Sequence, residues 1–166
     1  MTARITFVLA CAALGFMAFT AHGHGEAKAG AGAKKAISTD EYPWGREGES
    51  RKVSRTIAVD MADTMRFSPS EVKVKRGDSV KFVVRNTGKV MHEMVIGTRE
   101  QLEKHADTMK KYPGMEHDAP YMAHVSPGKK EEIVWTFDKP GTFMYGCLIP
   151  GHWEAGMKGT IVVAAN

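Results

Sequence analysis

The sequence contains only two cysteines, Cys11 and Cys147, and they are not expected to pair with each other. Cys11 lies in an apolar N-terminal run that we interpret as an export signal, so cleavage of the signal leaves Cys147 alone. A single cysteine in an exported protein requires an explanation other than a disulfide bond. The chain also lacks a Ser/His/Asp or Cys/His arrangement typical of nucleophilic catalysis. We therefore expect a protein that is not an enzyme.

Long runs of one charge sign are absent as well. The formal net charge is +4, and Lys and Arg alternate with acidic residues along the whole chain. This pattern excludes a basic nucleic-acid-binding patch. A weak positive balance is compatible with a redox or copper-transfer protein as partner.

Three segments differ in composition. Residues 1–21 carry Arg4 followed by an apolar run, which is typical of a signal peptide and predicts a periplasmic protein. The run is shorter than the roughly 20 residues that span a bilayer, and an uncleaved anchor is the alternative. Residues 22–50 are rich in Gly, Ala and polar residues, which predicts a flexible tail whose end Tyr42 and Trp44 can attach to the domain. Residues 51–166 form the predicted domain.

Short runs with alternating apolar residues follow from residue 51 onward. The apolar residues of these runs are Val53, Ile57, Val59, Val72, Val74, Val80, Phe82, Val84, Met94, Ile96, Ile133, Trp135, Phe137, Phe143, Tyr145, Ile161 and Val163. Period-2 runs separated by turn residues indicate an antiparallel β-sandwich or barrel. Between residues 99 and 111 the spacing changes, because Leu102, Ala106 and Met109 recur at helical intervals. This pattern predicts a short helical insertion.

Three potential metal ligands follow one another at five-residue intervals: Cys147, His152 and Met157. A thiolate, an imidazole and a thioether suit copper, and a blue-copper site combines two His and one Cys with a weak axial Met. The missing second imidazole has to come from elsewhere in the fold. His92 is the best candidate, with His117 and His124 as alternatives. Zinc is the alternative metal, but a thioether is a poor zinc ligand.

The segment from Met65 to Val163 resembles the cupredoxin superfamily of plastocyanin, azurin and pseudoazurin. The motifs that carry the resemblance are Phe67-Ser-Pro69, Val74-Lys-Arg-Gly77, Val80-Lys-Phe82, Asn86, His92, Gly141-Thr-Phe143 and Cys147-x4-His152-x4-Met157. Two of its runs, Met91-His-Glu-Met94 and Pro150-Gly-His-Trp-Glu-Ala-Gly-Met-Lys-Gly159, look like those of CopI-type periplasmic copper-tolerance cupredoxins.

The resemblance implies an all-β fold, a two-sheet Greek-key β-sandwich with the short helical insertion. It implies a type 1 copper site with the ligands His92, Cys147, His152 and Met157. It also implies a role in copper tolerance by Cu(I) binding or oxidation, and the alternative is a soluble one-electron carrier. Many cupredoxins have Asn after the first ligand His, where it braces the cysteine loop, whereas this chain has Glu93. Such a change next to a ligand can retune the metal site.

Further soft ligands lie in the helical insertion and the loop after it. Met115, His117, Met122 and His124 combine thioethers with imidazoles, a set that suits Cu(I). The alternative is that the methionines fill irregular parts of the core. We treat these four residues as candidate ligands for an additional, weakly bound copper ion.

The tail generates a first prediction. Cleavage after Ala21 exposes His22-Gly23-His24 at the new N-terminus, where the α-amine, two amide nitrogens and the His24 imidazole make a square-planar Cu(II) site. Our hypothesis is that the exported protein begins at His22 and binds Cu(II) there, with chelation through the His22 ring or a solvated tail as the alternatives. Phe19 is a poor residue three positions before this cut, and cleavage after Gly23 would start the chain at His24. Mass spectrometry of the exported protein locates the cut, and a mature chain that begins beyond His24 contradicts the hypothesis.

Overall fold

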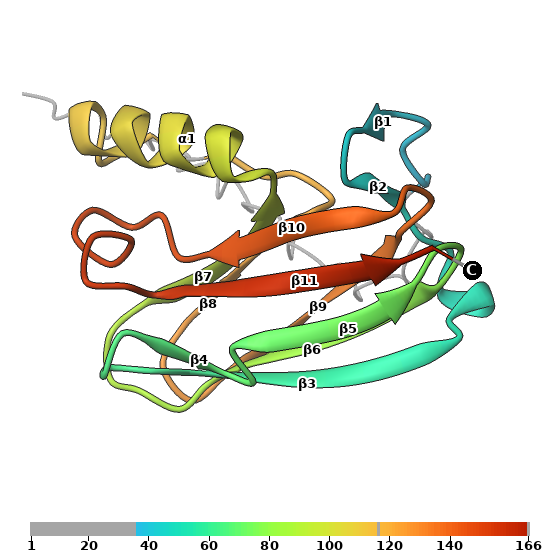
Figure 1. Ribbon diagram of the computed structural model, residues 1–166. Helices are drawn as coiled ribbons and strands as arrows, with labels where there is room; N and C mark the ends of the chain where they lie inside the picture. Colours follow the sequence, from blue (N-terminus) through green and yellow to red (C-terminus); the bar gives the residue numbers. More distant parts are fainter. Residues whose placement is uncertain (1–35, 116, 166) are drawn as a thin grey trace, which may run out of the picture. The chain divides into compact units, whose positions relative to one another are not determined.

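The computed structural model describes residues 36–115 and 117–165. The predicted signal peptide, and residues 22–35 of the predicted tail, lie outside this part of the chain. The described residues form two β-sheets that pack face to face, and the helix α1 (Arg99–Lys111) lies on the outer side of one sheet (Figure 1). The predicted two-sheet sandwich with a short helical insertion is therefore confirmed.

The larger sheet has six strands in the order β1 (Glu41–Tyr42), β2 (Gly45–Glu47), β9 (Lys130–Thr136), β6 (Ser79–Asn86), β3 (Arg55–Ala62) and β4 (Arg66–Ser68). The second sheet has five, in the order β5 (Glu71–Lys75), β11 (Lys158–Ala164), β10 (Gly141–Gly146), β7 (His92–Gly97) and β8 (Met122–Val125). A short 3-10 helix, η1 (Ser50–Lys52), precedes β3.

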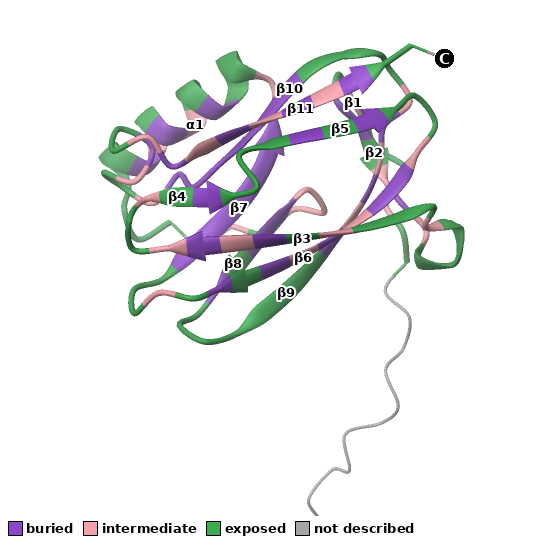
Figure 2. Cartoon of the chain, turned by 60° about the horizontal axis from the view of Figure 1, so that its bottom comes forward, coloured by how far each residue is buried: buried purple, intermediate pink, exposed green. Residues whose placement is uncertain are grey.

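The core lies between the two sheets, as the period-2 pattern predicted. Alternate residues of a strand point to opposite faces of its sheet, and in β6 the inward residues Val80, Phe82 and Val84 are fully buried. Their counterparts on the facing sheet include Ile96 and Ile161, which are equally buried. Figure 2 shows that buried residues recur along the strands of both layers. Burial of this apolar surface is the main force that holds the layers together.

Most strand pairs are antiparallel, as the alternating pattern indicated, but two pairs are parallel. Strand β3 pairs in parallel with β6, and β5 pairs in parallel with β11. The first pair arises because the chain leaves the larger sheet after β4, runs through the second sheet as β5 and then returns as β6. The second arises because the chain returns to the second sheet beside β5 only with β11, its last strand. Parallel neighbours need such a long connection, since a tight hairpin joins only antiparallel strands.

The domain also begins earlier than residue 51. Strand β2 pairs with β9, and Trp44 beside it is buried. The Trp135 indole N–H donates to the Trp44 carbonyl at 2.9 Å, and the Tyr42 ring lies 5.0 Å from the Trp44 ring and 5.0 Å from the Tyr121 ring. Two aromatic residues thus attach residues 41–47 to the sandwich, as their position at the end of the predicted tail suggested.

Helix α1 has the predicted bounds and the predicted buried face of Leu102, Ala106 and Met109. The Thr98 hydroxyl accepts a hydrogen bond from the Gln101 amide at 3.3 Å, which caps the N-terminus of the helix. Its 13 residues cover part of the outer face of the second sheet. Among the described residues no helix is both long and apolar enough to cross a membrane.

Close packing between β10 and β11 generates a second prediction. Gly159 lies opposite Tyr145, and a side-chain carbon at this position would overlap the tyrosine ring. The ring has little freedom to move, because its hydroxyl donates to the Pro69 carbonyl at 2.6 Å. We expect Gly159→Ala to lower the free energy of unfolding by about 1–3 kcal/mol, measured by urea denaturation.

The matched control is Gly114→Ala, since nothing lies within 4 Å of the added carbon there. We expect this exposed substitution to change the free energy of unfolding by less than about 0.5 kcal/mol. Equal stabilities of the two variants would contradict the packing described for Tyr145.

Candidate metal centre

A compact loop between β10 and β11 carries three of the predicted ligands. The Cys147 amide donates to the Met157 carbonyl at 3.1 Å, and the Met157 amide donates to the His152 carbonyl at 3.0 Å. These bonds close the loop on itself, so that its first and last residues lie side by side. Cys147 and Met157 are both fully buried, whereas His152 is half-buried. The loop therefore holds its ligand side chains in fixed positions.

The structure brings His92 to this loop. The ligand atoms of His92, Cys147 and His152 all lie within 4.8 Å of one another, and among the described residues this is the one His/Cys/Asp/Glu group gathered so closely. The Cys147 Sγ lies 3.2 Å from the His152 Nδ1, and the two imidazole rings lie 5.1 Å apart. His92, rather than His117 or His124, therefore completes the arrangement.

A carboxylate outside the group orients His92. The His92 Nε2 lies 3.1 Å from the Asp63 Oδ1. A neutral imidazole that donates Nε2–H to this carboxylate keeps its lone pair on Nδ1. The His92 Nδ1 is buried and has no hydrogen-bond partner. A buried nitrogen without a partner is costly, and a metal ion between His92, Cys147 and His152 is the partner that it lacks.

Asp63 is itself held in place by the loop before His92. The Lys89 amide donates to its carboxylate at 2.8 Å and the Val90 amide at 3.4 Å. The bond from Lys89, followed by those from His92 and Val90, holds the pKa of Asp63 below its usual value. The carboxylate is therefore charged at neutral pH and keeps the His92 ring in one orientation.

The Cys147 sulfur lies in a dry environment. Burial raises the pKa of its thiol to about 12, although the Glu93 amide N–H, 3.4 Å from Sγ, acts in the opposite direction. A thiol with this pKa and no exposure is inert as a nucleophile. A bound cation deprotonates such a thiol outright, so the environment of Cys147 suits metal ligation.

Glu93 takes the bracing role that Asn has in many cupredoxins. Its Oε1 accepts a hydrogen bond from the Leu148 amide at 2.8 Å, directly after the cysteine. Its Oε2 lies 2.9 Å from the His124 Nε2, and this bond raises the pKa of His124. The carboxylate is almost fully buried. The cysteine loop is thus anchored to β7 and β8 through one side chain.

The other candidate ligands are distributed unevenly. Met122 packs under α1 with Val95 and Leu102, whereas Met115 is exposed. The rings of His117 and His124 lie 5.8 Å apart. His22 and His24 lie outside the described residues.

His105, which the sequence analysis did not single out, joins His117 and His124. Its ring lies 4.5 Å from that of His117. The sequence feature that could have identified His105 is its position in the helix. It follows the buried Leu102 by three residues and therefore borders the buried face of α1.

The profile of a family described as copper binding proteins, plastocyanin/azurin family, matches residues 53–164. The chain belongs to this family of copper-binding proteins, the cupredoxins. It is 48% identical over 142 residues to the copper-resistant cuproprotein CopI of Rubrivivax gelatinosus, covering 86% of this chain and 84% of that protein. It is 33% identical over 149 residues to the protein of the same description from Pseudomonas aeruginosa, covering 72% and 82%.

The fold has solved counterparts. A reduced auracyanin from the photosynthetic bacterium Roseiflexus castenholzii superimposes with a TM-score of 0.58 and 25% identity, covering 68% of this chain and 98% of that one. The chain is thus a copper-binding cupredoxin related to CopI copper-resistance proteins. The soft donor set and the unpartnered His92 nitrogen fit copper.

The contact between Asp63 and His92 generates a third prediction. Removing a carboxylate that orients a metal-ligating imidazole typically lowers metal affinity 10–100-fold, which corresponds to about 1–3 kcal/mol of binding free energy. We expect Asp63→Ala to weaken copper binding by about this factor. Asp63→Asn keeps an acceptor oxygen and should bind more tightly than Asp63→Ala. Competition with a chelator of known affinity measures both.

The control is Asp60→Ala on the neighbouring strand β3. Arg85 donates two hydrogen bonds of 2.6 and 2.9 Å to the Asp60 carboxylate, whereas the His92 ring lies against Asp63. Copper affinity should be unchanged in this variant. A similar loss in the Asp60 and Asp63 variants would mean that Asp63 does not act through His92.

Proposed function

We propose that this chain is a periplasmic type 1 copper protein that contributes to copper tolerance, with His92, Cys147, His152 and Met157 as the copper ligands. One observation carries the proposal: His92 meets Cys147 and His152 with its Nδ1 buried and without a partner. We propose further that the chain binds copper and exchanges electrons without catalysing the turnover of an organic substrate.

The donor set supports this role chemically. A thiolate and a thioether favour Cu(I), and imidazoles accept Cu(II), so bound copper supplies a centre that alternates between the two states. The residues around it limit rearrangement, since Asp63 holds His92 and Glu93 holds the cysteine loop. Burial of Cys147 and Met157 keeps water away from the sulfur ligands.

Copper tolerance is the preferred role because two relatives of this chain are described as copper-resistant cuproproteins. In this role the protein removes Cu(I) from the periplasm, either by binding it or by taking an electron from it. In the second case a redox protein accepts that electron from the bound copper. The predicted signal peptide at residues 1–21 is consistent with export to this compartment.

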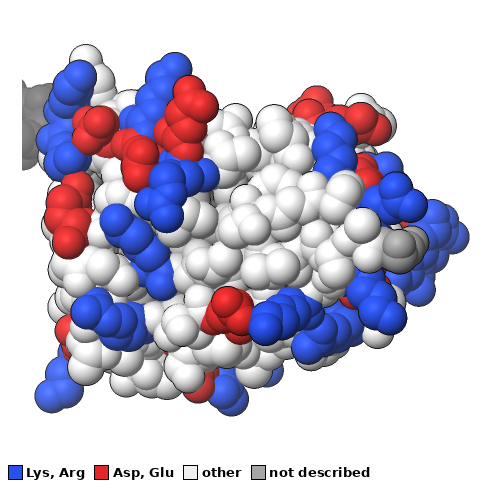
Figure 3. All heavy atoms as spheres, viewed as in Figure 1, with Lys and Arg blue, Asp and Glu red and all other residues white. Residues whose placement is uncertain are grey.

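A soluble one-electron carrier is the second candidate function. Val90 and Met91 precede His92 and are exposed to 45% and 44%, and they offer an apolar surface next to the centre for docking a redox partner. On the face shown in Figure 3, side chains of both charge signs surround an uncharged area. Charge on this face therefore does not favour a strongly acidic or strongly basic partner.

The ligand assignment generates a fourth prediction. We expect Cu(II) to produce an intense thiolate-to-copper absorption band that corresponds to one copper ion per chain, and Cys147→Ser to abolish it because the thiolate is lost. Met115→Leu is the matched control, since Met115 is exposed and lies outside the group. A band that survives in Cys147→Ser would contradict the assignment.

The same variant separates the two functions in cells. A chromosomal deletion should make growth sensitive to copper, and the wild-type gene but not the Cys147→Ser gene should restore tolerance. Normal copper tolerance combined with slower respiratory growth would favour the electron carrier instead.

A further inference from the structure

Three imidazoles meet on the outer side of the second sheet, under α1. They come from three elements: His105 from α1, His117 from the loop after it and His124 from β8. Ring centroids lie 4.5 Å apart for His105 and His117, and 5.8 Å apart for His117 and His124. The rings of His92 and His152 at the copper centre are separated by 5.1 Å. Imidazoles that share one metal ion have centroids about 5 Å apart, given metal–nitrogen bonds of about 2.0–2.1 Å.

His117 is oriented like a metal ligand. Its Nδ1 lies 3.1 Å from the Met115 carbonyl, to which only an N–H can donate. The neutral ring therefore has its lone pair on Nε2. This Nε2 is buried and has no hydrogen-bond partner. Metal-ligating histidines typically donate their other ring N–H to a carbonyl or carboxylate in this way.

Glu93 supplies an oxygen donor and negative charge to the cluster. It is the direct cross-strand neighbour of His124 in the pairing of β7 with β8. Its Oε2 lies 2.9 Å from the His124 Nε2, although the carboxylate is almost fully buried. A buried carboxylate needs a positive partner. His124 is that partner in the metal-free protein, and a divalent cation held by the imidazoles would take its place.

We propose that His105, His117 and His124, together with Glu93, form a second metal site for a divalent transition-metal ion. Imidazole and carboxylate donors suit Cu(II) and Zn(II), and Cu(II) binds most tightly to such donors. This site differs from the expected Met115/His117/Met122/His124 set for Cu(I), because Met122 belongs to the core under α1 and Met115 is exposed. It is also distinct from the thiolate centre, to which it adds an N/O donor set.

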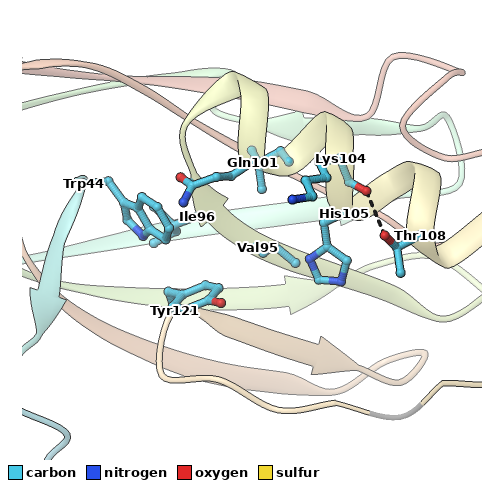
Figure 4. Close-up of a pocket in the computed structure, with 10 residues that line it drawn as sticks. Trp44, Val95, Ile96, Gln101, Lys104, His105, Thr108 and Tyr121 are labelled. Atoms are coloured by element: carbon cyan, nitrogen blue, oxygen red, sulfur yellow. Dashed lines mark hydrogen bonds between the residues drawn. The ribbon is translucent and has the colours of Figure 1, made fainter. Parts of the chain in front are cut away.

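Of the three histidines, His105 lines a groove of about 300 Å³ beside α1. Figure 4 shows His105 extending from the helix into this groove, between Lys104 and Thr108 on one side and Val95 of β7 on the other. The nitrogens of the three rings are not yet gathered as closely as the atoms of the His92 group. Binding therefore turns at least one imidazole, and His124 exchanges its contact with Glu93 for a shared ion.

Equilibrium dialysis against Zn²⁺ tests the proposal on the full chain. The starting protein carries His22→Ala and His24→Ala, which removes the predicted N-terminal site, and its thiolate centre is first filled with copper. We expect it to bind one further equivalent of Zn²⁺. Adding His105→Gln, His117→Gln and His124→Gln should abolish that equivalent, whereas adding Met115→Leu and Met122→Leu should leave it. Equal Zn²⁺ binding by the triple-Gln protein and the starting protein would overturn the site.

Two further variants keep the result interpretable. His117→Gln alone changes a loop residue and should weaken Zn²⁺ binding at least about tenfold, so it replaces the triple-Gln protein if that protein does not fold. An unchanged affinity in His117→Gln would also overturn the site. Cys147→Ser lacks the thiolate centre and should still bind the Zn²⁺ equivalent that depends on the three histidines. Its behaviour separates a failure of this site from a failure of the type 1 assignment.

Discussion

The hydrogen bonds of the buried Glu93 carboxylate hold the metal-binding end of the sandwich together. One oxygen accepts from the Leu148 amide and the other contacts His124, while the Glu93 amide reaches the Cys147 sulfur. A buried carboxylate is tolerated only when such partners satisfy it. Loss of the His124 contact without another positive partner would leave the carboxylate charge unpaired. The cysteine loop, β7 and β8 are therefore fixed in position together.

Strand β7 separates two environments by the alternation of its side chains. Successive residues of a strand point to opposite faces, so His92 faces the thiolate centre and Glu93 faces the histidines under α1. The two faces also differ in donor chemistry. On one side a buried cysteine and methionine accompany imidazoles, and on the other the proposed ligands are three imidazoles and a carboxylate. Soft donors favour Cu(I), and the N/O set favours divalent ions.

The presence of two different donor sets bears on the choice between copper tolerance and electron transport. An electron carrier needs one centre that changes little between its oxidation states, and the bracing by Asp63 and Glu93 meets that need. A protein that handles copper benefits from additional sites, and those sites need not exchange electrons. The proposed cluster of His105, His117 and His124 therefore fits copper handling better than electron transport alone.

The local features could be predicted from the sequence: the alternating strands, the bounds and buried face of the helix Arg99–Lys111, and the ligand spacing within residues 147–157. Each depends on residues close together in the chain, where periodicity and turn chemistry act directly. The parallel pairing of β3 with β6 and the addition of β2 to the sheet became visible only in the folded chain. The tertiary structure also selected His92 over the other histidines and placed His105 beside His117. These contacts arise from strand register and helix packing between distant segments, which no local spacing encodes.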